Sequence, residues 1–496
     1  MSARISFYGS REAELFTREV EESFYAVRHK NLVRNTEHGM EGFVGASVDG
    51  RPFWNTMWTR DTSVFLRELV MMGCFEDAKL VAKNLIKLVD LNEQGFYTFP
   101  EYFDYGVKSF GSELDGTCAI MIGMALLWEH SPADDPIRTV ISDFLTGEKS
   151  PTQYILYTLE TEPFVRGTGE FGCGCQVGGE CYNVVQNMLV VLSLTAIARM
   201  ARAQRRHEYA EALKNKAKKV LDNMRRYFVR GDGSWVWALD ILTLTPDERV
   251  NNLPVNKGTA LINGVLSMAA DVLGFALSEE NFPVLKECSV TFDRLMKNDR
   301  RRELFDRYGM FSQFDEFWPG ATCPSYGQGY AVQAMLLLDK IDMYSPAIDF
   351  MADIVYNPIP EYKLNRESRY YIHEIYYTPY SVGRMKIVEG CGALNLVGVA
   401  ETVKIARMMV GADDSEKGNL KIIPRLPRRW KGYSVKGLPL LSNGEVFACD
   451  IDYAVSDKGE SFIFTAPAGK TVKSLSVRFK GGYRTYRDIG SLTVSE

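Results

Sequence analysis

The chain has 496 residues, of which 46% are hydrophobic and 24% are charged, and its formal net charge is -5. This composition is ordinary for a globular protein with a large core. The slight acidic excess argues against a nucleic-acid binder, because such proteins normally carry a basic patch. The N-terminal residues include no apolar segment of signal-peptide length, and no apolar run reaches the length of a membrane span. We therefore expect a cytoplasmic protein that has neither a membrane nor a nucleic acid as partner.

The nine cysteines favour the same compartment. Those that fall in apolar helical patterns indicate buried free thiols; they are Cys74, Cys118, Cys288 and Cys391. A Gly-rich segment holds Cys173, Cys175 and Cys181. Thiolates beside a carboxylate suit zinc, but the paired Cys-x-x-Cys spacing is missing and no His follows closely. We expect these cysteines to fill tight space in the loop, and we predict no metal and no cofactor.

Residues 11–410 are mostly helical by pattern. Apolar residues recur at three-to-four spacing in 11–29, 62–72, 76–92, 115–130, 135–145, 181–203, 207–228, 258–273, 278–297, 327–341, 344–356 and 389–410. Some helices, such as 181–203, are nearly apolar all round, whereas the next one, 207–228, has a Lys and Arg face. Such a pair, repeated about six times, predicts an inner ring of buried helices inside an outer ring of half-exposed helices.

The connections between these helices alternate in length. The long ones are rich in Gly, aromatic residues and carboxylates, and they are 93–114, 157–180, 229–257, 305–326 and 357–388. The alternation puts all the long loops at one end of a double barrel. Long structured loops usually carry function, so we expect them to surround one cleft.

The pattern changes after about residue 411. Residues 411–418 are polar and rich in turn formers, and the stretches beyond them alternate between apolar and polar residues. Asn443-Gly444 and Lys458-Gly459 are hairpin signals. We predict a mainly α protein, with an (α/α)6 toroid over 1–411 and a small antiparallel, sandwich-like β-domain over 412–496.

Trp58, Arg60 and Asp61 precede the first apolar inner helix. Asp61 and Thr62 are good residues for a helix start, so a ring, a guanidinium and a carboxylate meet at one helix mouth. The ring can stack on the face of a sugar while the charged pair binds neighbouring hydroxyls. The alternative is a helix-capping Asp61 with a structural Arg60 and a core Trp58.

The run Trp58-Thr-Arg-Asp61 resembles the glucoamylase-type motif of the six-hairpin glycosidase superfamily, in which Trp-Thr-Arg-Asp-Ser opens a barrel helix; Thr62 replaces the Ser here. The resemblance implies that Arg60 and Asp61 hold hydroxyls of the non-reducing-end sugar and that Trp58 forms a pocket wall. Three segments extend it. Residues 112–117 resemble the Asp-Gly start of the next inner helix, 313–337 the general-base loop with its helix, and 422–430 the start of the β-domain of rhamnosidase- and debranching-type relatives.

An inverting glycosidase needs two carboxylates that face each other roughly 6.5–9.5 Å apart. For the general base we predict Glu316, which stands among aromatic residues just before an inner helix, where the superfamily keeps its base. Its neighbour Asp315 is the alternative, and a solvated loop carboxylate is the competing interpretation. We expect Trp318 and Tyr326 of the same segment to bind substrate.

The general acid is expected in the loop before the helix 181–203. Glu170 and Glu180 are the candidates, and Glu170 is preferred because it lies beside an aromatic residue and between glycines. The superfamily's usual Trp-Glu-Glu is absent. Glu113 and Asp115 are fallback acids, and Asp115 is otherwise expected to bind substrate. A working acid needs burial against aromatic residues to raise its pKa.

Two further aromatic segments fall in long loops on the same expected face. Residues 99–105 and the run from Trp235 to Asp240 are candidates to line subsites. Trp237 is the preferred binder of the second segment, although a core role for it is equally consistent with the sequence.

The histidines keep two other enzyme classes open. Epimerases and isomerases on the same barrel use paired His residues, and His38 and His373 fall in loops, whereas His130 and His207 are expected to be solvated at helix ends. A polysaccharide lyase would use Tyr or His near Arg, and this set is available in Arg369, Tyr370, His373 and Tyr376. A non-catalytic sugar-binding role is the remaining alternative.

Together these features predict an exo-acting, inverting glycoside hydrolase whose partner is an oligosaccharide or a small glycoside. The tetrapeptide favours an α-glucoside, and the C-terminal domain is equally compatible with an α-rhamnoside. The oligomeric state is not indicated.

Overall fold

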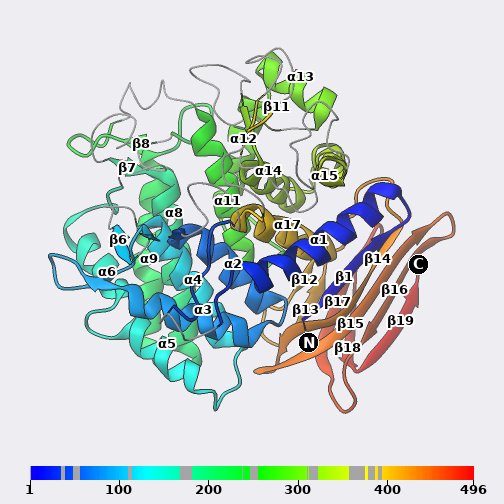
Figure 1. The fold of residues 1–496 in the computed structure, drawn as a ribbon, viewed down its shortest axis with the longest axis horizontal. Coiled ribbons are helices and arrows are strands. Elements are labelled where there is room, and N and C mark those ends of the chain that lie inside the picture. The colour runs from blue at the N-terminus through cyan, green and yellow to red at the C-terminus, as the bar shows by residue number, and fades with distance from the viewer. Residues whose placement is uncertain are drawn as a thin grey trace.

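The computed structural model describes residues 2–34, 40–47, 56–104, 106–109, 114–167, 181–236, 238–245, 255–309, 311, 322–356, 375–377, 386–388 and 394–496. These residues form a double ring of helices with two β-sheets beside it (Figure 1). The first helix of the chain, α1 (Arg11–Lys30), contacts both parts, since it packs on strand β1 (Arg4–Tyr8) and on two helices of the rings.

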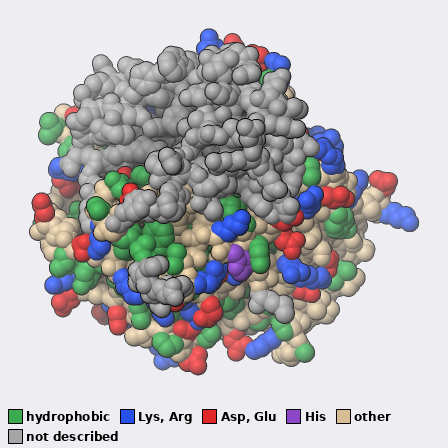
Figure 2. Space-filling model, in the orientation of Figure 1, with side chains coloured by type: hydrophobic (Ala, Val, Ile, Leu, Met, Phe, Trp, Pro, Cys, Tyr) green, Lys and Arg blue, Asp and Glu red, His purple; other side chains and the backbone are tan. Residues whose placement is uncertain are grey.

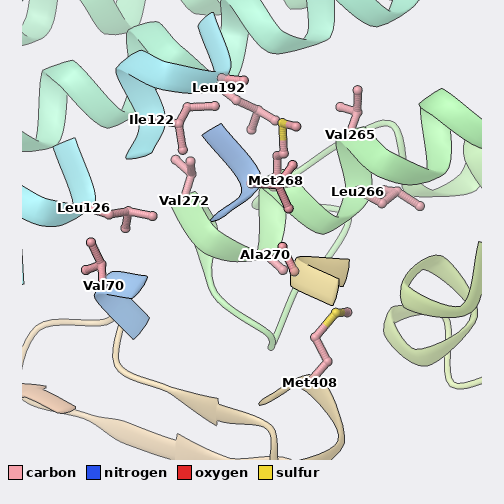
Figure 3. Packing of buried hydrophobic residues seen from close by; sticks show 14 of the residues in the cluster. Val70, Ile122, Leu126, Leu192, Val265, Leu266, Met268, Ala270, Val272 and Met408 are labelled. Carbon is pink, nitrogen blue, oxygen red and sulfur yellow. The ribbon is translucent and has the colours of Figure 1, made fainter. Parts of the chain in front are cut away.

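Within the described residues, six helices form the inner ring. They are α2 (Thr59–Met71), α4 (Asp115–His130), α8 (Val184–Ala203), α11 (Val255–Leu273), α14 (Ser325–Leu337) and α17 (Leu396–Val410). Each packs on the next, and α17 packs on α2 to close the ring. All residues of α17 are buried, and in α4 Glu129 alone is not. Apolar side chains of the inner helices meet inside the ring (Figure 3).

Helix α8 shows why the sequences of the inner helices carry apolar residues on all faces. Among the described residues it is the one helix long and apolar enough to cross a membrane by length and composition. However, 89% of its apolar window is buried inside the protein. Its composition is therefore explained by its position in the inner ring, where both faces pack on other helices.

The outer ring consists of amphipathic helices. They are α1, α3 (Phe75–Leu88), α5 (Pro136–Thr146) with α6 (Pro151–Thr161), α9 (His207–Tyr227), α12 (Leu285–Leu295) with α13 (Asp299–Tyr308), and α15 (Ile341–Tyr356). Helix α9 buries one stripe at three-to-four spacing, made of Ala210, Leu213, Ala217, Val220 and Met224. On the face shown in Figure 2, charged side chains of both signs are scattered over the described surface. The predicted (α/α)6 toroid is confirmed.

Small sheets gather where the inner helices begin. They pair β2 (Thr56–Trp58) with β5 (Tyr102–Asp104) and β6 (Val107–Ser109), β3 (Asp90–Leu91) with β4 (Tyr97–Thr98), β7 (Tyr182–Asn183) with β8 (Ala238–Leu239), and β9 (Thr322–Pro324) with β10 (Ile375–Tyr377) and β11 (Lys386–Val388). Strands β2, β7 and β9 run directly into α2, α8 and α14. The predicted long loops thus fold at one end of the barrel, as far as the described residues show.

The C-terminal part forms two sheets. One has the order β1, β14 (Gly432–Ser442), β15 (Glu445–Ser456), β16 (Gly459–Thr465) and β19 (Ser491–Ser495); the other has the order β12 (Ala412–Asp413), β13 (Leu420–Ile422), β17 (Val472–Phe479) and β18 (Gly482–Ile489). Pairing is antiparallel except between β13 and β17, which are parallel. Asn443 and Gly444 both have positive φ in the turn from β14 to β15, which confirms this hairpin signal. Strand β1 pairs with β14, so residues 4–8 join the sheet.

The interface between the rings and the sheets is both apolar and charged. The ring of Phe7 lies 5.2 Å from that of Trp430 and 5.9 Å from that of Phe16 on α1. His130, at the end of α4, is only 2% exposed, and its Nε2 lies 3.3 Å from Asp414 Oδ2. The expectation of a solvated His130 was wrong, because the segment after β12 covers the end of α4. His207 is exposed, as expected.

The described cysteines agree with the sequence-based expectation except at Cys181, for which no disulfide was predicted. Cys74, Cys118 and Cys288 are buried and free, which confirms the expectation, and Cys449 is a further buried free thiol. Cys181 is disulfide-bonded. Cys173, Cys175 and Cys391 lie outside the described residues.

Candidate functional site

The site is built on the start of α2. The helix begins at Thr59, three residues before the expected start, and Trp58 at the N-cap position makes no side-chain cap. The Thr59 N–H donates to the carbonyl of Glu101 at 3.0 Å, and the Thr59 hydroxyl donates to the carbonyl of Pro100. The Glu101 carbonyl thus takes the place of a capping acceptor, and the Thr59 hydroxyl fastens the helix start to the neighbouring loop. Asp61 lies in the first turn and is not the cap, so the capping alternative was wrong.

Two aromatic side chains form one wall of the site. Strands β2 and β5 pair so that Trp58 lies opposite Tyr102. Directly opposed residues point to the same face of a sheet, and the two rings are 4.8 Å apart at 41°. The segment 99–105, expected to line subsites, thus supplies Tyr102, although it was not singled out as a binding residue.

Two carboxylates flank the guanidinium of Arg60. Its Nη1 lies 3.4 Å from Asp115 Oδ2, and its Nε lies 3.9 Å from Asp61 Oδ1. Asp115 opens α4 and is 5% exposed. Its other oxygen accepts the Gly116 N–H at 2.6 Å, which fixes the carboxylate at the helix start. The structure thus brings together the predicted Trp58, Arg60, Asp61 and Asp115.

Gly116 explains how the starts of α2 and α4 come so close. A Cβ atom at this position would lie 3.3 Å from Thr59 Cγ2 and 3.4 Å from the Arg60 nitrogen. Both distances are tighter than usual Cβ contacts, so any side chain would push α4 away from Arg60. The Asp115-Gly116 pair therefore supplies both a carboxylate and the space that this carboxylate needs.

A small pocket opens at this point. Its lining comes from the starts of α2 and α4 and from the loop before β5: Trp58, Thr59, Arg60, Phe99, Pro100, Glu101, Asp115, Gly116 and Thr117. The pocket combines ring faces, one guanidinium and two carboxylates. Such a set can bind a ligand that offers C–H faces and hydroxyls together.

A second pocket lies further inside the ring. It shares Arg60 and Asp115 with the first, and the rest of its lining is Ala119, Val185, Leu189, Gly264, Val265, Met268 and Tyr330. The Tyr330 ring lies against α11, since a Cβ on Gly264 would be 3.2 Å from it. Burial raises the pKa of the Tyr330 hydroxyl, and the charge of Glu401 acts in the same direction. Sequence reasoning missed Tyr330, which stands one turn after Tyr326 on α14 and so shares a face with it.

Several predicted residues lie outside the described part of the chain. They are the catalytic candidates Glu170, Glu180 and Glu316, the alternatives Glu113 and Asp315, and the binding candidates Trp237 and Trp318. Tyr326 lies in the first turn of α14, and its side chain is not described. The epimerase and lyase candidates His38, Arg369, Tyr370 and His373 are outside as well, and of Tyr376 only the backbone, in β10, is described.

Trp235 and Asp240 have structural roles. Trp235 is 1% exposed, and its backbone N–H donates to the Thr291 hydroxyl. Asp240 accepts hydrogen bonds from the Leu242 N–H and the Thr243 hydroxyl in a tight turn. Neither side chain lines the two pockets described above, and a place for either in a subsite stays a prediction.

Comparison with known proteins finds similarity in structure only. No protein-family model matches the chain, and no curated protein matches it in sequence. An α-L-rhamnosidase from Dictyoglumus thermophilum matches with a TM-score of 0.59 and 9% identity, covering 99% of this chain and 50% of its own. A Streptomyces avermitilis α-L-rhamnosidase, solved with L-rhamnose, matches with a TM-score of 0.57 and 11% identity over 100% of this chain and 42% of its own.

A putative kojibiose phosphorylase from the human microbiome matches with a TM-score of 0.51 and 9% identity, over 100% of this chain and 67% of its own. The chain spans about half the length of the first rhamnosidase that it matches. At these identities the similarity shows a shared fold.

Proposed function

We propose that this chain, which has the (α/α)6 fold of the six-hairpin glycosidase superfamily, is an exo-acting glycoside hydrolase that removes a non-reducing-end sugar with inversion. One observation carries the proposal. Arg60, Asp115 and Trp58 line one pocket at the end of the barrel where the inner helices begin, and the Tyr102 ring packs against Trp58.

Each group in this pocket has a part in sugar binding. The ring of Trp58, which packs against Tyr102, takes a C–H face of the sugar, and Arg60 donates to its hydroxyl oxygens while Asp115 accepts from its hydroxyls. The 3.4 Å between Arg60 Nη1 and Asp115 Oδ2 exceeds the 2.7–2.9 Å typical of a strong charge-assisted bond. A diol can therefore replace this contact with shorter bonds to both groups.

In this proposal Glu316 is the general base, and Glu170, or alternatively Glu180, is the general acid. The acid protonates the glycosidic oxygen as the bond to the anomeric carbon breaks, and the base takes a proton from the water that attacks that carbon from the opposite face. The described flanks support the assignment. Gly167 and Cys181 exchange both backbone hydrogen bonds at the start of α8, and β9 leads into α14 at the same end of the barrel.

The identity of the sugar is the finer part of the proposal. The Trp58-Thr-Arg-Asp61 motif favours an α-glucoside. The inner pocket favours an α-rhamnoside as second candidate, because its lining of Ala119, Val185, Leu189, Val265 and Met268 is apolar. L-Rhamnose is a 6-deoxy sugar, and its methyl group would bury apolar surface against these side chains.

The test is hydrolysis of matched 4-nitrophenyl α-glucoside and α-rhamnoside by the parent and by Glu316→Gln. We expect the parent to cleave one of them, with inversion seen by proton NMR of the first-formed anomer, and the variant to lose at least about 100-fold in kcat. A loss of less than about tenfold removes Glu316 as base, and retained configuration removes inversion. Interconversion of free sugars, or formation of an unsaturated uronide, would replace the hydrolase by an epimerase or a lyase.

A further inference from the structure

A cluster of charged side chains lies inside the inner ring, deeper than the two pockets. Arg67 follows Arg60 by two turns of α2 and therefore lies about 10 Å further along the barrel on the same helix face. With it are Glu68 of α2, Asp271 of α11, and Lys404 and Arg407 of α17. The side chains of all five are between 0% and 3% exposed.

The two carboxylates of this cluster are engaged by two of its cations. Arg407 donates to both oxygens of Glu68 at 2.7 Å and to Asp271 Oδ1 at 3.2 Å. Lys404 donates to Asp271 Oδ2 and, at 2.9 Å, to the Ser267 carbonyl. Burial opposes ionisation of Asp271, but the charges of Lys404 and Arg407 outweigh it and lower its pKa to about 2. Both carboxylates are therefore paired with cations of the cluster.

Arg67 is the one cation of this cluster that donates no hydrogen bond to either carboxylate. Its Nη1 lies 3.7 Å from Asp271 Oδ2, which is too long for a hydrogen bond. None of its three side-chain nitrogens has a hydrogen-bond partner in the structure, as far as the described residues show, and the side chain is 0% exposed. Asp271 is its one ion-pair partner among the described residues, and that carboxylate is already bonded to Lys404 and Arg407. A buried guanidinium without hydrogen bonds is strongly destabilising, so a further acceptor of opposite charge is expected beside it.

Glu401 of α17 does not supply this charge. Its Oε2 accepts from Gln333, its Oε1 has no hydrogen-bond partner within the described structure, and no ion pair with Arg67 is found among these residues. Burial raises the pKa of Glu401 to about 8, although Lys404 and Arg67 act against it. Burial likewise lowers the pKa of Lys404, to about 8. At neutral pH the acid is mostly neutral and the amine mostly charged, so three cations face two carboxylates.

We propose that the barrel interior binds one monovalent anion of chloride size against the guanidinium of Arg67. A single negative charge balances the cluster, whereas a divalent anion would reverse the imbalance. A halide also suits the close-packed interior better than a larger anion. The fully buried side chain excludes a substrate carboxylate, because substrate reaches Arg60 from the mouth of the barrel. The anion therefore has a structural role, and the site does not depend on the proposed glycosidase activity.

Bromide diffraction locates the anion directly. Crystals of the parent protein grown or soaked in sodium bromide are measured at the bromine absorption edge. We expect an anomalous peak inside the inner ring, in contact with the guanidinium of Arg67. Peaks on the surface alone, an adventitious ion only, would overturn the proposal, and so would an Arg67 bound solely by water.

Thermal unfolding tests the anion in solution. The parent is dialysed into sodium gluconate and then equilibrated with increasing chloride at constant ionic strength. We expect a saturable rise in Tm of about 2 °C, since ligands that bind only the folded state stabilise it. Arg67→Met should show no response to chloride. The control is Arg199→Met, which removes a half-buried arginine that is bound to Glu129, and it should keep the response.

Two results in the thermal assay would contradict the site. One is a parent whose Tm is the same in gluconate and in chloride. The other is an Arg67→Met protein that still responds to chloride as the parent does. If Arg67→Met does not fold, the bromide peak in the parent decides.

Discussion

Two groups of charges lie along the same face of α2 and differ in how they are held. At the mouth of the barrel, Arg60 has a 21% exposed side chain and contacts Asp115 at 3.4 Å. In the interior, Arg407 is 3% exposed and contacts both oxygens of Glu68 at 2.7 Å. The interior pair is satisfied by protein alone, whereas the pair at the mouth is longer and its Arg60 is partly exposed. Similar residue types thus serve packing in the interior, and at the mouth we propose that they bind a ligand.

The largest effect is expected from breaking the interior pair. Arg407→Met leaves the Glu68 carboxylate buried without its partner, which should lower the free energy of unfolding by about 3–5 kcal/mol. Urea denaturation measures the change. The exposed pair of Arg302 with Asp306 on α13 is the control, and Arg302→Met should have no measurable effect. If Arg407→Met were as stable as the parent, the interior cluster would not hold the ring together.

At the mouth of the barrel we expect a large loss of activity and little loss of stability. Arg60→Ala should lower kcat/KM on the cleaved glycoside by about 100-fold, the typical loss for one donor in a preorganised site. The free energy of unfolding should change by less than about 1 kcal/mol, because the Arg60 side chain is partly exposed and its contact is long. Steady-state kinetics and urea denaturation on the same preparation separate the two. Equal losses of activity and stability would show that Arg60 is structural like Arg407.

Gly116 tests whether the spacing at the mouth matters. Gly116→Ala adds a methyl group 3.3 Å from Thr59 and 3.4 Å from the Arg60 nitrogen, and should cost about 1–3 kcal/mol of stability and raise KM. Gly231→Ala is the matched control, because a Cβ there has nothing within 4 Å and should be near neutral. The prediction fails if both variants bind substrate like the parent.

The smallest expected effect is a pH dependence of stability at the C-terminal end of α4, where His130 contacts Asp414. Burial lowers the pKa of His130, but the hydrogen bond and charge of Asp414 outweigh it and raise the value. A raised pKa means that the stabilisation is complete below the unfolded value, about 6.5, and is lost as pH rises through the folded value. Burial raises the pKa of Asp414, but His130 outweighs this and lowers it, so its stabilisation is lost only as pH falls through the folded value, below the unfolded value of about 4.

His130→Gln should therefore destabilise most between about pH 4.5 and 6.5. The difference from the parent, measured by urea denaturation, should shrink toward pH 9. A difference that is the same at pH 6 and pH 9 would show that the pair does not titrate in this way.

The sequence predicted the parts of the fold that depend on local pattern. The burial of nearly all of α4 follows from its apolar composition, and the turn at Asn443-Gly444 follows from its residues. Features that depend on distant partners were missed. The start of α2 is set by the loop carbonyls of Pro100 and Glu101.

Two other features were not predicted because they also depend on partners that are distant in the sequence. His130 is buried by Asp414, 284 residues away, and β1 finds its partner strand β14 more than 400 residues later. In the candidate site, sequence motifs predicted that Trp58, Arg60, Asp61 and Asp115 would come together, but not the inner pocket with Tyr330, because no local pattern indicates which helices face each other across the ring.

The most direct test is a crystal structure of the protein soaked with glucose and, separately, with L-rhamnose. The account predicts a monosaccharide in the pocket at the start of α2, with one face on Trp58 and hydroxyls bound by Arg60 and Asp115. A sugar bound elsewhere, with the Arg60–Asp115 contact unchanged, would contradict it.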